Sequence, residues 1–188
     1  LRYKSNFYES AMFLFENPAN ELTAHIRFTQ QKKYGAVNLS LHAKAKNDSI
    51  TTAVNWGNNG NTTYSGKFNT ETFFKHLESS ESKKLQTQIN VLPSDVIVND
   101  TTWQIHPSKI ILGDQHIKVD NFLFSNDKQF LQIDGKASTE PQDTLFLNLN
   151  DIDLGYVFDI VGISEDVDFK GKTTGYAVAS QLFSKPQM

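Results

Sequence analysis

The sequence predicts an all-β protein whose strands form an antiparallel meander, and two observations support this prediction. Along most of the chain, apolar and polar residues alternate one by one, as they do in an extended strand with one dry face and one wet face. Between these stretches lie short segments rich in Gly, Asn and Asp, such as 57–63, which favour tight reversals. Because short reversals join antiparallel neighbours, we expect the strands to pair in chain order.

The first half of the chain contains several alternating stretches. In the clearest of them Val37, Leu39 and Leu41 fall on one face, while Ser40 and Lys44 fall on the other. Pro93 ends the last stretch, since proline offers no N–H to a strand ladder. The predicted strands of this half are 21–28, 35–45, 50–56, a more polar strand over 62–69, and 84–92.

The second half repeats the pattern, with a turn predicted at 125–128 and a bend or close backbone approach at Gly171 and Gly175. Its predicted strands are 116–124, 129–138, 143–152 and 167–183.

Two segments depart from alternation and predict short helices that cover the sheet. In 70–84, Phe73, Phe74 and Leu77 have the spacing of a helical stripe. In 151–163 the apolar residues also follow a helical stripe, with Asp153 as the predicted N-cap and Gly162 as the stop.

Composition excludes several classes of function. The net charge of −3 comes from interspersed acids and bases, which argues against nucleic acid as a partner. There is no cysteine, and no run of about 18 apolar residues that would span a bilayer. The chain starts at Leu1 without an initiator methionine or a leader, so we expect residues 1–188 to be a single β-rich segment of a larger protein.

The sequence predicts neither an enzyme nor a bound cofactor or metal. It has no Gly-x-Ser-x-Gly elbow, and its five histidines never fall at paired metal-ligand spacing. Trp56, Tyr64 and Trp103 suggest an alternative function, a sugar-stacking platform in a carbohydrate-binding or adhesion β-sandwich. Against it, Trp103 alternates in phase with Ile105, as a core or groove residue does.

One-sided strands need something to cover their apolar faces, either a second layer or a ligand. Periodicity alone is compatible with a closed sandwich and with an open groove. Sequence motifs in the second half help to choose between the closed sandwich and the open groove. In chain order they are "TWQIHPSKI", "VDNFLF" followed by "DGKAS", "LNDIDLGYVFDIV" and "VDFKGKTTGYAVASQLFSKPQM". With these motifs, residues 85–188 resemble the TamB-like translocation and assembly proteins of the AsmA-like superfamily.

The resemblance implies a meander curled into an open taco-like groove or half-barrel with an apolar interior. It implies a periplasmic location, with the full-length protein anchored in the inner membrane of a Gram-negative bacterium and bound to an outer-membrane barrel partner through other parts of its chain. The groove would hold phospholipid acyl chains or unfolded outer-membrane protein strands. The residues expected to line it are Val37, Leu39, Leu41, Ile89, Val91, Ile105, Ile117, Val119, Leu131, Ile133, Leu145, Leu147 and Leu149.

Overall fold

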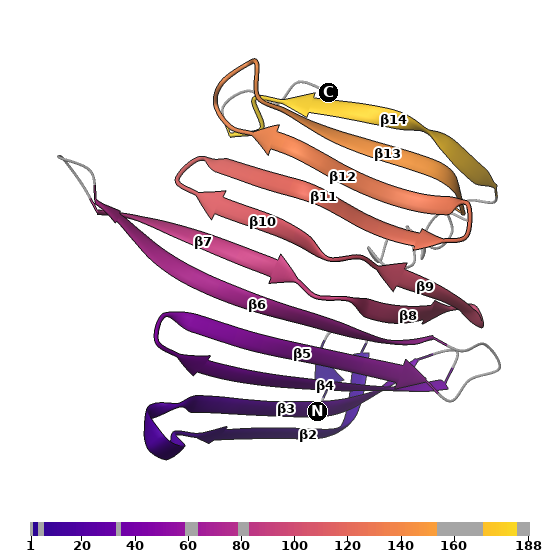
Figure 1. The fold of residues 1–188 in the computed structure, drawn as a ribbon. Coiled ribbons are helices and arrows are strands. Elements are labelled where there is room, and N and C mark those ends of the chain that lie inside the picture. Colours follow the sequence, from indigo (N-terminus) through magenta and orange to yellow (C-terminus); the bar gives the residue numbers. More distant parts are fainter. Residues whose placement is uncertain are drawn as a thin grey trace.

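The chain folds into one large antiparallel sheet. The computed structural model describes residues 2–3, 6–32, 35–58, 64–78, 83–153 and 171–183. These residues form a 14-stranded sheet whose strands run largely in chain order from β1 to β14 (Figure 1). Within the described ranges, the helical structure is limited to a single 3-10 turn, η1, at Pro18–Asn20. The predicted all-β antiparallel meander is confirmed.

The N-terminal strands form a simple up-and-down series. At the reversal between β4 and β5, Asn47 and Asp48 have φ values of 47° and 56°, the left-handed conformation that a two-residue hairpin turn requires. Asn and Asp tolerate this conformation better than most residues. The alternation pattern predicted no strand over the residues of β2. In the structure, β2 pairs with β3 over most of its length. The strands are β1 (Arg2–Tyr3), β2 (Asn6–Glu16), β3 (Leu22–Lys32), β4 (Gly35–Lys46), β5 (Ser49–Asn58) and β6 (Ser65–Glu78).

Two prolines divide the centre of the sheet. Four shorter strands follow here: β7 (Lys83–Val91), β8 (Ser94–Val98), β9 (Thr101–Ile105) and β10 (Ser108–Gly113). β7 and β8 both pair with β6 and are separated by a break at Pro93, while β9 and β10 both pair with β11 and are separated by a break at Pro107. The breaks face each other, since β7 pairs with β10 and β8 with β9. Because proline has no N–H to donate to the strand ladder, the row formed by β7 and β8 and the neighbouring row formed by β10 and β9 are interrupted side by side.

The C-terminal strands complete the meander without closing it. They are β11 (His116–Asn126), β12 (Gln129–Ala137), β13 (Thr144–Asp153) and β14 (Lys172–Ser180). The order of paired strands begins with β1 and ends with β14, and no pairing joins these two ends among the described strands. The sheet therefore curls and stays open, in agreement with the predicted taco-like groove (Figure 1).

The short helix predicted within 70–84, ending in a polar loop, is wrong in its described part, and 79–82 lie outside the described residues. Residues up to Glu78 belong to β6, and β7 begins at Lys83. The apolar spacing of Phe73, Phe74 and Leu77 also fits a strand with apolar side chains on both faces. Pairing with β5 and β7 supplies the backbone hydrogen bonds that a short helix would have made for itself.

The second predicted helix is wrong at its start. Asp153 is the last residue of β13, so it is strand and not an N-cap. The rest of the predicted helix, 154–163, lies outside the described residues. Of the predicted final strand, 172–180 is β14 and 167–170 is outside the described residues.

The most buried part of the structure lies around the β8–β9 hairpin. Val91 and Trp103 are only 2% and 3% exposed. The indole of Trp103 stacks on the ring of Phe124, with ring centroids 4.8 Å apart. The cluster of buried side chains extends as far as Ile152 of β13, and Trp56 of β5 packs against it. One apolar cluster thus connects strands from both halves of the curled sheet.

Candidate functional site

Strand register turns the separate alternations into one continuous apolar face. Phe28 lies opposite Leu39, which lies opposite Trp56, and the neighbouring rows repeat this arrangement. Followed from strand to strand, the register places all the predicted lining residues on this same face, which we call the inner face. They are Val37, Leu39, Leu41, Ile89, Val91, Ile105, Ile117, Val119, Leu131, Ile133, Leu145, Leu147 and Leu149.

The register also gives the inner face its chemical character. Among the described strand pairs, every residue directly opposite a lining residue is uncharged. Ile89, for example, lies between Thr72 and Ile110, and Leu147 lies between Ile133 and Ala177. This part of the inner face therefore offers apolar contact and no charge.

A bulge in β11 adds two aromatic residues that alternation alone does not predict. Val119 is on the inner face, so strict alternation would place Asn121 there and turn Phe122 away. The register instead shifts between Val119 and Phe122, with Asn121 in a left-handed conformation at φ 49°. The backbone N–H of Asn121 donates to Oδ1 of Asp134 at 2.8 Å, which satisfies the group that the bulge removes from the ladder. Phe122 and Phe124 therefore join the inner face.

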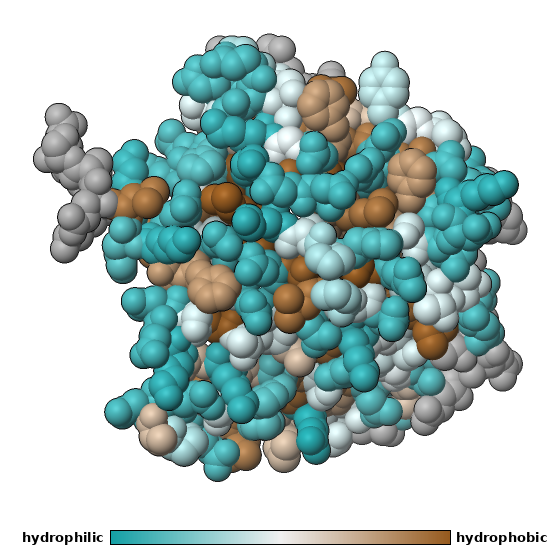
Figure 2. Space-filling model, viewed as in Figure 1, coloured by the Kyte–Doolittle hydropathy of each residue, from teal (hydrophilic) through white to brown (hydrophobic). Residues whose placement is uncertain are grey.

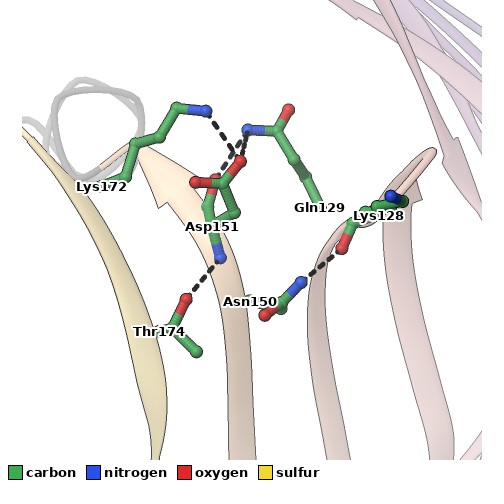
Figure 3. A network of polar contacts seen from close by, with 6 residues as sticks. All are labelled: Lys128, Gln129, Asn150, Asp151, Lys172 and Thr174. Carbon is green, nitrogen blue, oxygen red and sulfur yellow. Dashed lines mark hydrogen bonds and ion pairs between the residues drawn. The ribbon is translucent and has the colours of Figure 1, made fainter.

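A second bulge, near the end of β13, is held by the polar network in Figure 3. Asp151 has a φ of 53°, and its backbone N–H donates to Oγ1 of Thr174 at 2.9 Å. Its Oδ2 accepts from Nζ of Lys172 at 2.7 Å and from Nε2 of Gln129 at 3.2 Å. The bulge changes the phase of the strand, so that Ile152 reaches the buried cluster on the inner face.

Exposure varies along the inner face. Its centre is covered, as the values for Val91 and Trp103 show. At the β2 edge, Phe13 and Phe15 lie on the same face, opposite Ile26 and Ala24, and are 63% and 61% exposed. A closed hydrophobic core would not leave two neighbouring phenylalanines in water. The apolar inner face is therefore exposed at this edge of the described sheet.

The other face of the sheet, the outer face, is mainly polar. It carries surface ion pairs such as Lys44 with Glu21 at 3.7 Å and Lys118 with Asp120 at 2.7 Å. On the side of the molecule seen in Figure 2, hydrophilic side chains predominate, with smaller hydrophobic areas among them. Exposed ion pairs of this kind add little stability.

The sugar-stacking platform does not fit the position of Trp103. Trp103 is buried under neighbouring side chains and stacks on Phe124. Trp56 lies against Gly66, where a Cβ atom would be 2.5 Å from Cζ2 of Trp56. A sugar ring needs an exposed aromatic face, which Trp103 does not offer.

Other signals of function are few. In the described part of the chain, no group of three or more His, Asp or Glu side chains is placed to hold a metal ion. No helix among those residues is long and apolar enough to cross a membrane. Comparison with known protein families, with curated proteins and with solved structures finds no match in any of the three.

Proposed function

We propose that this chain is a non-enzymatic segment of a TamB-like periplasmic protein. In this proposal its inner face holds phospholipid acyl chains, or shields unfolded outer-membrane protein strands, between the inner and outer membranes. The observation that carries the proposal is the largely apolar inner face, which has no charged residue directly opposite a lining residue in the described strand pairs and continues to an exposed edge at Phe13 and Phe15. The sequence resemblance of residues 85–188 to TamB-like proteins supports the same function.

The physical basis of binding would be apolar contact. Each methylene removed from water contributes about 0.8 kcal/mol, so a long acyl chain laid across the lining residues gains enough to be held without any directed bond. Since no charged residue lies directly opposite a lining residue in the described strand pairs, a charged head group would remain at the open side of the groove. Selectivity among head groups is not expected from such a surface.

Two pairs of substitutions on β12 and β13 test this function. The first, Leu131→Asp with Leu147→Asp, puts two charges on the half-buried inner face. The second, Gln132→Asp with Asn148→Asp, adds the same charges to the outer face, at positions that lie directly opposite each other. Uptake of a fluorescent fatty acid and native mass spectrometry with phospholipid measure binding, and circular dichroism measures folding.

We expect the unmodified chain and the outer-face variant to bind the fatty acid. The inner-face variant should remain folded and lose most of the binding, because charges in an open groove stay hydrated but repel an acyl chain. Unfolding of the inner-face variant alone would instead indicate a closed core, in which the carboxylates are buried without partners. Absence of binding by the unmodified chain would count against the proposal directly, and a glycan screen would then test the carbohydrate-binding alternative.

A further inference from the structure

Two histidines on the outer face lie side by side across neighbouring strands. His25 of β3 is directly opposite His42 of β4, and their rings stack with centroids 4.2 Å apart and an interplanar angle of 22°. The two residues are far apart in the sequence, so no ligand spacing reveals them there. Only the β3–β4 register makes them neighbours.

We propose that His25 and His42 together bind one first-row transition-metal ion, such as Zn²⁺, Ni²⁺ or Cu²⁺. Directly opposite residues in an antiparallel pair have Cβ atoms about 4.5–5.5 Å apart. Rotation of the two side chains out of the stack can therefore bring one nitrogen of each ring to about 2.0–2.1 Å from a shared ion. Water completes the coordination, since the described residues offer no third His, Asp or Glu ligand at this point. Imidazole nitrogen suits all three metals.

The surroundings of His42 favour its neutral form, which is the form that binds metal. Burial lowers the pKa of His42, and the charges of His25 and Lys44 lower it further, while Glu21 acts in the opposite direction. Neutral imidazole keeps the lone pair that a metal requires.

Nearby charges determine how strongly the site can attract a cation. Lys44 follows His42 on the same face of β4 and pairs with Glu21, which partly neutralises it. Arg27 stands two positions after His25 on β3. On the far side of the pair, β5 presents the uncharged Ala53 opposite His42, and β2 presents Leu14 opposite His25. Lys44 and Arg27 are therefore the two repulsive charges on the same face next to the proposed ion.

Metal titration of the whole chain tests the proposal. Isothermal calorimetry with ZnCl₂, NiCl₂ and CuCl₂ should find one saturable site for at least one metal. His25→Gln and His42→Gln should each weaken it at least about tenfold, since a second ligand held in place adds to affinity through its effective concentration. His76→Gln, on β6, is the matched control and should leave affinity unchanged. Lys44→Gln should strengthen binding, because it removes the neighbouring positive charge.

A second measurement separates loss of ligand from loss of fold. Metal that binds the folded chain raises its melting temperature. That rise should disappear in both histidine variants while their far-ultraviolet circular dichroism stays that of the unmodified chain. The proposal is overturned if none of the three metals binds more tightly than about 0.1 mM, or about 5.5 kcal/mol. Equal affinity in the His25 and His42 variants and the unmodified chain would overturn it as well. None of these outcomes depends on lipid binding at the inner face.

Discussion

Replacement of Trp103 by alanine should destabilise the sheet more than any other single truncation on the inner face. The side chain is 3% exposed and stacks on Phe124. A buried aromatic side chain removes about 150–250 Å² from water, which at about 25 cal/mol per Å² corresponds to about 4–6 kcal/mol as an upper bound. Measured losses for Phe or Trp to Ala in protein cores are about 3–5 kcal/mol. We therefore expect Trp103→Ala to lower the free energy of unfolding by about 4 kcal/mol.

Urea unfolding followed by circular dichroism measures this change, with two further variants for comparison. Trp103→Phe keeps a ring on Phe124 and removes an indole N–H that has no hydrogen-bond partner, so it should cost only about 1 kcal/mol. Tyr176→Ala truncates a side chain that is 81% exposed and should stay within about 0.5 kcal/mol of the unmodified chain. If Trp103→Ala lost no more stability than Tyr176→Ala, the β8–β9 hairpin would not be the centre of packing.

Two other predictions concern a glycine and a histidine. Gly135→Ala should cost at least about 2 kcal/mol in urea unfolding, because φ is +112° and a Cβ atom would lie 2.3 Å from the backbone oxygen of Thr144. Gly175→Ala, with nothing within 4 Å of the added atom, is the control, and equal losses in the two variants would refute this reasoning. For His42, burial and the charge of His25 lower the pKa below its usual value of 6.5, so the unfolded chain takes up its proton at a higher pH than the folded chain does. The stability that depends on neutral His42 is therefore present above pH 6.5 and is lost as the pH falls through and below that value. Unfolding midpoints measured at several pH values should show this loss. If His42→Gln had the same pH dependence as the unmodified chain, the result would contradict this prediction.

Much of the fold could be predicted from local patterns. Alternation in 35–45 and in 129–138 identifies strands and their apolar faces, because the two faces of a strand repeat every second residue whatever the strand pairs with. The same rule placed the predicted lining residues of each strand together on one face of that strand. It failed over 70–84, where apolar residues occupy both faces of β6 and the pattern resembles a helix.

Three features were determined only by the tertiary structure: the bulges, the breaks in the strands and the residues that lie opposite each other across strands. Asn121 and Asp151 change the phase of their strands, which brings Phe122 and Ile152 to the inner face against the simple alternation. The adjacency of His25 and His42 depends on the β3–β4 register, which pairs residues distant in sequence.

The sequence by itself therefore determined that this chain is built of one-sided antiparallel strands, because side-chain periodicity is a property of each strand alone. Tertiary structure decided that the apolar faces join into one curled surface, covered at Trp103 and open at Phe13 and Phe15. The physical reason is that register, bulges and curvature arise from hydrogen bonds and packing between distant segments, and local periodicity carries no information about these contacts.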